Sequence, residues 1–240
     1  MIPLRDDNPT RIKPVLTVTL ITINCLVFFY QLSLGPRAGR LFLFQFGAIP
    51  SVIVGGAALP ANVAAVPPFV SIFTSMFLHG SILHLAGNML YLWIFGNNIE
   101  EALGRFRFLV FYLLCGFAAA MVHVLSNVDS TIPTIGASGA ISGVLGAYLL
   151  LYPRAQVLTL VPFFFFIQLV YIPAGIVLSL WFLLQLAYGS LGEGGTGGGV
   201  AWWAHVGGFV AGMLLVGMFK KRNVRFFNPP HYHPSRFRGW

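Results

Sequence analysis

The chain has 240 residues, of which 57% are hydrophobic and only 8% are charged, with a mean hydropathy of +0.82. So few polar residues cannot cover the surface of a soluble globule of that size, so soluble enzymes and soluble binding modules are excluded. The excess of 14 basic over 6 acidic residues is divided among separate segments, which is typical of membrane loops and predicts no nucleic-acid partner.

Apolar stretches of helical length, without the alternation of barrel strands, predict an all-α, polytopic membrane protein in a lipid bilayer. A polar N-terminal tail, residues 1–14, precedes the membrane domain, residues 15–219, and a basic tail, residues 220–240, follows it. Six transmembrane helices are expected at about 15–34, 82–96, 106–125, 138–152, 162–187 and 200–219.

The connections between the expected spans differ in character. Residues 35–77 are broken by prolines yet apolar, which is typical of a segment lying in the membrane interface. Residues 96–105 are expected to be a tight turn, in which Glu100 and Glu101 form ion pairs with Arg105. The glycine-rich residues 189–199 lack the lysine of a phosphate-binding loop and are expected to be a mobile lid.

Six spans place both termini on one side of the membrane, and the basic residues indicate which side. All of the 14 Lys and Arg residues except Arg37 and Arg40 fall on the side of the termini. Because Lys and Arg accumulate in cytoplasmic loops, we expect both termini in the cytoplasm and the protein in the inner cell membrane.

A serine and a histidine lie at equal depth in two different spans. Ser138 opens the fourth span in the string Gly-Ala-Ser-Gly, and His205 lies about one turn into the sixth, among small residues that allow close helix packing. A serine hydroxyl is a poor nucleophile until a base removes its proton, and His does this near neutral pH. We expect a dyad and not a triad, because the acids on that side, Asp129 and Glu193, lie in expected loops.

The second span adds polar groups at the same depth. His84 and Asn88 share one helical face, and with the backbone N–H of Ser138 they are expected to donate hydrogen bonds to an oxyanion. His79 is rotated away from His84 on a regular helix and is expected to have a supporting role at the mouth. The array of His79, His84 and Asn88 is a minor candidate for a metal site, because the His-Glu-x-x-His string of membrane metalloproteases does not occur. We expect no metal and no cofactor.

Each motif has a simpler interpretation when taken alone. Gly-Ala-Ser-Gly strings are common in packed membrane helices, and a lone His in a span is a polar contact about as often as a catalyst. His123, Cys25 and Cys115 are expected to pack without a catalytic role. The combination of serine, histidines and asparagine at one depth is what favours catalysis.

The combined motifs closely resemble those of the rhomboid family of intramembrane serine proteases. The matching strings are Gly136-Ala137-Ser138-Gly139, His79-xxxx-His84-xxx-Asn88 and Ala204-His205-xx-Gly208-xxx-Gly212. The resemblance implies a serine endopeptidase with a six-span, bacterial-type core and a Ser138–His205 dyad. It implies that oxyanion and substrate binding belong to His84, Asn88, Ser138 and Gly136. It further implies an interfacial first loop, a gate and cap formed by the fifth span and the glycine loop, and single-span membrane proteins as substrates.

One position departs from the family pattern. Some rhomboids carry an aromatic residue four positions after the nucleophile, which stacks on the catalytic histidine, whereas this chain has Ser142. Ser142 shares the helical face of Ser138, which favours a hydrogen bond there instead. Two alternatives remain open, a catalytically silent rhomboid-like protein that binds client helices, and a small transporter, although paired broken repeats are missing.

Overall fold

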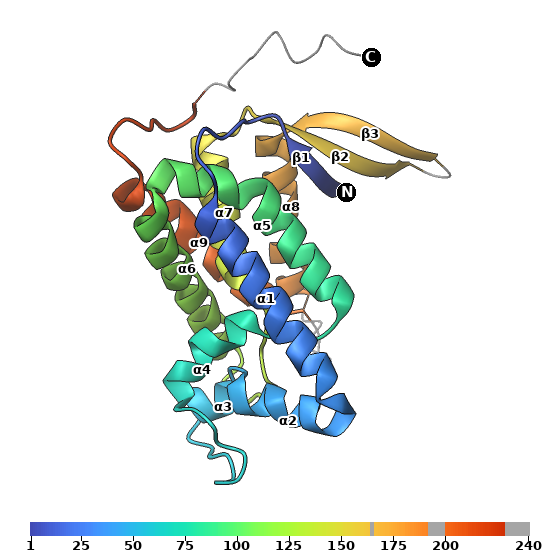
Figure 1. Ribbon diagram of the computed structural model, residues 1–240, viewed down its shortest axis with the longest axis vertical. Helices are drawn as coiled ribbons and strands as arrows, with labels where there is room; N and C mark the ends of the chain where they lie inside the picture. The colour runs from blue at the N-terminus through green and yellow to red at the C-terminus, as the bar shows by residue number, and fades with distance from the viewer. Residues whose placement is uncertain (164–165, 192–199, 229–240) are drawn as a thin grey trace.

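Long helices packed side by side make up most of the computed structural model, which describes residues 1–163, 166–191 and 200–228 (Figure 1). The helices are α1 (Val15–Ser33), α2 (Gly35–Phe46), α3 (Pro50–Ile53), α4 (Pro68–Thr74), the 3₁₀ helix η1 (Ser75–Phe77), α5 (Ile82–Leu103), α6 (Arg105–Ser126), α7 (Ser138–Leu151), α8 (Ala174–Ser190) and α9 (Trp202–Phe219). The strands are β1 (Ile2–Asp6), β2 (Gln156–Phe163) and β3 (Phe166–Pro173).

The lengths of the helices bear on how many cross a membrane. Among the described residues, α1, α6 and α9 are long and apolar enough to cross a membrane. The segment formed by α4 and η1 is bent by 83° relative to α5, and the two together make a fourth candidate if they are counted as one span. The apolar α7 and α8 have only 14 and 17 residues. At about 1.5 Å per residue they are shorter than the ~30 Å of bilayer hydrocarbon. The outward faces of the bundle are apolar, with Leu26, Phe106 and Leu214 exposed by 64%, 78% and 73%.

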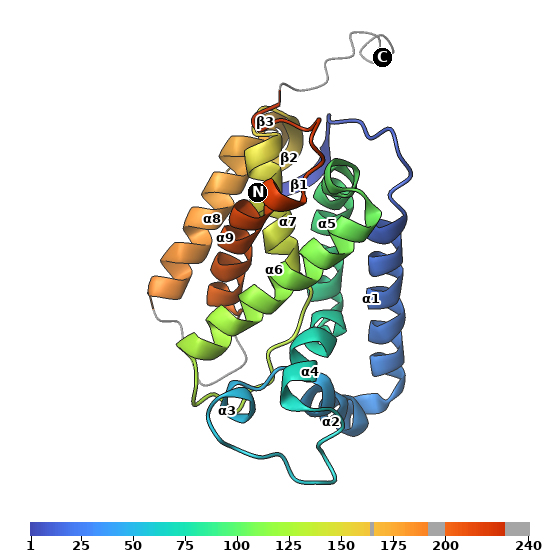
Figure 2. The same cartoon turned by 90° about the vertical axis from the view of Figure 1, so that its left-hand side faces the viewer.

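The helix α7 lies inside the bundle, in contact with α5, α6, α8 and α9 (Figure 2). It is preceded by Gly136, whose φ of +121° favours glycine. A Cβ added to Gly208 of α9 would collide with the carbonyl oxygen of Gly139, and one added to Gly212 with that of Gly143. The small residues therefore allow backbone-to-backbone contact between α7 and α9, as the sequence predicted.

The prediction of a tight turn at residues 96–105 is wrong. These residues are mostly compatible with a helix, so α5 continues through them to Leu103 and is followed by Gly104, which has a φ of +84°. Glu100 is fully buried and accepts hydrogen bonds from the N–H of Leu16 and from the N–H and hydroxyl of Thr17, at 3.0, 2.8 and 2.8 Å. A carboxylate there satisfies unpaired N–H groups at the start of α1 and interacts favourably with its dipole.

The N-terminal residues carry regular structure and tertiary contacts. Strand β1 pairs antiparallel with β2. Farther along, the carbonyl of Asn8 accepts a hydrogen bond from the side chain of Asn98 at 2.8 Å, and the N–H of Arg11 donates to Glu101 at 2.9 Å. Glu101 therefore also binds backbone, where an ion pair was expected, and the segment is tied to α5.

The fifth predicted span begins in the wrong place, because residues 156–163 and 166–173 form the paired antiparallel strands β2 and β3, and the helix α8 begins only at Ala174. The segment is rich in Val, Ile and Phe, which favour strands, and Pro162 disfavours a helix. Hydropathy alone does not separate an apolar strand from a helix. The all-α class is therefore corrected to a helical bundle with a three-stranded antiparallel sheet in the order β1-β2-β3 (Figure 1).

The two ends of the bundle differ. The sheet and residues 220–228 lie at one end, here called the terminal end, and α2, α3 and α4 lie at the other, the loop end (Figures 1 and 2). At the terminal end the N–H of Lys221 donates to the carbonyl of Ala102 at 2.9 Å. At the loop end the hydroxyl of Thr74 donates to the carbonyl of Phe46 at 2.6 Å. This bond joins the ends of α2 and α4, and both α3 and α4 contact α6.

Candidate active site

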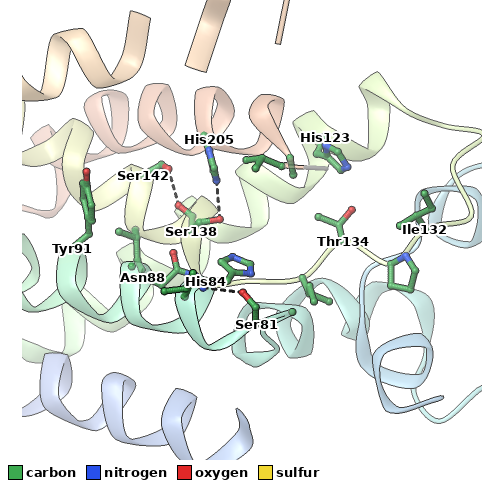
Figure 3. Close-up of a pocket in the computed structure, with 18 of the residues that line it drawn as sticks. Ser81, His84, Asn88, Tyr91, His123, Ile132, Thr134, Ser138, Ser142 and His205 are labelled. Carbon is green, nitrogen blue, oxygen red and sulfur yellow. Dashed lines mark hydrogen bonds between the residues drawn. The ribbon is translucent and has the colours of Figure 1, made fainter. Parts of the chain in front are cut away.

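Ser138 and His205 meet where α7 begins. The distance between Ser138 Oγ and His205 Nε2 is 2.8 Å (Figure 3). Ser138 is the first residue of α7, and His205 lies in the first turn of α9 and is 9% exposed. The structure thus brings together a hydroxyl and an imidazole that are 67 residues apart in the sequence.

Two residues of α8 surround the other side of the His205 ring. The distance between His205 Nδ1 and Gln185 Oε1 is 2.7 Å. The Trp181 ring lies 5.7 Å from the imidazole, centroid to centroid, at an interplanar angle of 36°. Sequence reasoning missed both residues. A lone amide inside the apolar run of α8 was the available signal, because polar groups in membrane spans usually have a role.

His84 and Asn88 of α5 lie on the side of Ser138 opposite His205 (Figure 3). The hydroxyl of Ser81 caps the start of α5 by accepting from the N–H of His84 at 3.1 Å. A Cβ added to Gly136 would lie 2.8 Å from His84 Nε2 and 3.7 Å from Asn88 Nδ2. Gly136 therefore leaves room for the two side chains beside the start of α7.

His79 lies before α5, in the segment that follows η1, and is fully buried. Its ring centroid is 5.1 Å from that of His84, and its Nε2 is 3.0 Å from Asn88 Nδ2. The expectation that His79 is rotated away from His84 is wrong, because α5 begins only at Ile82 and residues 78–81, between η1 and α5, are not helical. The carbonyl of His79 also accepts from the side chain of Gln31 in α1 at 2.8 Å.

Ser142 makes the kind of bond that its position favoured. Its hydroxyl donates to the carbonyl oxygen of Ser138 at 2.7 Å (Figure 3). The bond stays within α7 and does not involve His205. Aromatic contacts to the imidazole come from Trp181 of α8 and from Trp202 of α9, at centroid distances of 5.7 and 6.2 Å.

Ser138 and His205 border a cavity of about 900 Å³. The polar residues in its wall are His84, Asn88, His123, Ser138, Ser142 and His205, together with Ser81, Tyr91, Asn127, Ser130, Thr134 and Trp181. His123 thus reaches the site, although the sequence suggested only packing. None of the described lining residues is Asp, Glu, Lys or Arg. The predicted lid falls largely on residues 192–199, which lie outside the described residues.

The sequence of the bundle also matches a family model. Residues 67–222, which include Ser138, His205 and the polar residues of α5, match the Rhomboid domain. The chain belongs to the rhomboid family. The predicted family membership is thereby confirmed, and with it the class of multi-pass membrane proteins.

Curated relatives of this rhomboid come from different organisms. Rhomboid protein 1, mitochondrial, of Saccharomyces cerevisiae is 33% identical over 150 residues, which cover 60% of this chain and 40% of that protein. Rhomboid protease GluP of Bacillus subtilis is 35% identical over 137 residues, 57% of this chain and 24% of the relative. Rhomboid protease AarA of Providencia stuartii is 32% identical over 149 residues, which cover 55% of this chain and 49% of that protein. This rhomboid therefore spans less than half the length of each of these relatives.

Proposed function

We propose that this rhomboid is an intramembrane serine endopeptidase that cleaves transmembrane segments of membrane proteins. The observation that carries the proposal is the 2.8 Å contact between Ser138 Oγ and His205 Nε2 at the wall of the cavity. Two of the relatives are named rhomboid proteases, which supports the same activity.

The chemistry follows from the contact between a hydroxyl and an imidazole, which can exchange a proton. His205 Nε2 accepts the proton of Ser138 while Oγ attacks the peptide carbonyl, and the carbonyl oxygen becomes an oxyanion. His205 then returns the proton to the leaving amine, and an acyl-enzyme remains on Ser138. Water in the cavity, deprotonated by the same imidazole, hydrolyses the ester.

The oxyanion requires donors at the start of α7. The backbone N–H of Ser138 has no partner within its helix because it belongs to the first turn. His84 and Asn88 add side-chain donors from α5, next to Gly136. Donors held in place before the reaction stabilise the charge as it develops. His79 supports this set by holding the amide of Asn88.

The lining of the cavity supports single-span membrane proteins as substrates. Apolar side chains such as Leu83, Ile141 and Leu145 share its wall with the polar groups, which fits an apolar peptide segment. A peptide bond in a substrate helix is shielded by its own hydrogen bonds, so segments weakened by Gly or Pro are preferred. No cofactor takes part in these steps.

For the membrane arrangement we propose six spans, with α7 and α8 counted as short spans. The helix α7 is nearly enclosed by other helices, so it does not need to match the full thickness of the bilayer. Basic residues such as Arg105 and Lys221 accumulate at the terminal end, which favours that end in the cytoplasm of a cell with this protein in its inner membrane. Cleavage would then occur near the outer face.

The proposal is tested by cleavage of a model single-span substrate in proteoliposomes. Ser138→Ala should reduce cleavage to the background level while leaving the protein folded, whereas Ser33→Ala, at an exposed serine of α1, should cleave normally. A wild-type protein that binds the substrate without cleaving it would instead identify the silent, client-binding alternative. Cleavage that survives Ser138→Ala would refute the mechanism.

A further inference from the structure

The imidazole of His205 is hydrogen bonded at both ring nitrogens, by groups from two different helices. Nε2 contacts the hydroxyl of Ser138 on α7, and Nδ1 contacts the amide oxygen of Gln185 on α8 at 2.7 Å. Gln185 is only 6% exposed. A buried amide that contacts a buried imidazole leaves few alternative arrangements for either group.

The orientation of the Gln185 amide follows from its second contact. Its Nε2 donates to the main-chain carbonyl of Trp181, one turn earlier on α8, at 3.3 Å. Reversing the amide would place its oxygen against that carbonyl and its NH₂ against His205. The oxygen therefore faces the imidazole, and an amide oxygen can only accept a hydrogen bond.

This orientation determines which nitrogen of His205 carries the proton. In a neutral imidazole one nitrogen is a donor and the other an acceptor. Because Gln185 accepts, Nδ1 is the donor and Nε2 carries the free lone pair. That lone pair points at the hydroxyl of Ser138, which is the arrangement that a general base requires.

We infer that Gln185 is a positioning residue of this rhomboid, which holds His205 in the tautomer that accepts the proton of Ser138. The inference rests on the proposed function. Trp181 assists by packing against the ring at a centroid distance of 5.7 Å. In this chain an uncharged amide from α8 occupies the place that a carboxylate has in a triad.

The arrangement connects the base to the position of α8. Gln185 and Trp181 both lie on α8, whose outward face is exposed and apolar, with Ile176 at 57% and Leu183 at 58%. Displacement of α8 from α9 would remove Gln185 and Trp181 from the imidazole at the same time. His205 is therefore held in place as a base only while α8 lies against α9.

The first test compares Gln185→Leu with Gln185→Glu in the cleavage assay, with Gln168→Leu on the exposed strand β3 as control. The leucine variant loses the acceptor, so kcat should fall on the order of 10²-fold while KM changes less than about twofold. Gln185→Glu keeps an acceptor oxygen and should recover most of kcat. Equal losses in the two variants, or a change confined to KM, would overturn the positioning role.

The second test reads the tautomer without any substrate. Nitrogen-15 spectra of histidine-labelled protein in detergent distinguish protonated from free ring nitrogens, and His205→Ala identifies the signals of His205. We expect a proton on Nδ1 in the wild type and a mixture of tautomers in Gln185→Leu. A proton on Nε2 in the wild type would refute the inference. A protein with the expected tautomer but no cleavage would refute only the proposed function.

Discussion

The hydrogen bonds of individual side chains decide what each polar group of the site can do. An asparagine amide has two N–H donors. In this protein Asn88 Nδ2 contacts His79, which leaves the second N–H for another acceptor in the cavity. His79 thus limits the rotation of the amide, and this contact gives a physical meaning to a histidine whose role was only loosely expected.

The contribution of Asn88 can be measured with Asn88→Ala in the cleavage assay. Loss of one oxyanion donor should lower kcat on the order of 10²-fold with little change in KM, because the bond strengthens in the transition state. Asn223→Ala, at an exposed residue of the terminal end, serves as control. An unchanged kcat would remove Asn88 from the oxyanion site.

A second prediction at the scale of the residue concerns pH and the attachment of β1. The hydroxyl of Tyr148 donates to Asp6 at 2.6 Å. Burial raises the pKa of Asp6 from 3.8 to about 7, against the opposing effect of this hydrogen bond. The folded state therefore binds the proton more tightly than the unfolded state, and the stability that it contributes is lost as the pH rises from about 4 to about 7.

Hydrogen exchange checks this prediction. Protection of the β1 amides, corrected for intrinsic exchange, should decrease between pH 5 and pH 8 in the wild type. Asp6→Asn cannot ionise and should flatten that dependence, whereas Asp129→Asn, in the distant loop after α6, should keep it. The same slope in Asp6→Asn would show that another group is responsible.

At the scale of the element, the contact between α7 and α9 sets the distance between nucleophile and base. Gly208 lies one turn after His205 and touches the backbone of Gly139, which follows Ser138. The spacing of small residues in the sequence was sufficient to predict this contact, because only residues without bulky side chains permit it. The contribution of α8 was not predictable, since a single glutamine in an apolar run does not indicate its partner.

Gly208→Ala tests the helix contact. The new methyl group would meet the carbonyl of Gly139 and lie 3.3 Å from Ala119 Cβ, so α7 and α9 must separate. We expect the free energy of unfolding to fall by about 1–3 kcal/mol. The cleavage rate should fall on the order of 10²-fold, because a misplacement of about 1 Å has that effect.

Gly217→Ala is the matched control on the same helix. Its methyl group would lie 3.6 Å from Phe226, which is an ordinary contact. Stability and cleavage should both stay close to the wild type. If Gly208→Ala and Gly217→Ala behaved alike, close packing of α7 on α9 would not be what positions the site.

At the scale of the whole molecule, the sequence predicted the bundle better than its terminal end. Apolar stretches located the long helices, because burial in a bilayer depends mainly on local composition. The sheet was missed, since β1 pairs with residues more than 150 positions away, and such pairing has no local signature. The contacts of Glu100 with the start of α1 were missed for the same reason: they join distant segments.

The site itself followed from the sequence to the extent that it uses ionisable or nucleophilic residues. His84 and His205 stood out because such groups are costly in a membrane and rare there. His79 was misplaced by one assumption, that the helix begins before Ile82. Gln185 and Trp181 became recognisable only when α8 was placed beside α9, since neither has a motif of its own.

The central claim, that Ser138 is a nucleophile activated by His205, is tested most directly by peptide mapping of the purified protein after reaction with a fluorophosphonate in detergent. The claim predicts a single adduct on Ser138 that forms in the wild type and is lost in both Ser138→Ala and His205→Ala. An adduct on another serine, or labelling of Ser138 that persists at the wild-type rate in His205→Ala, would contradict it.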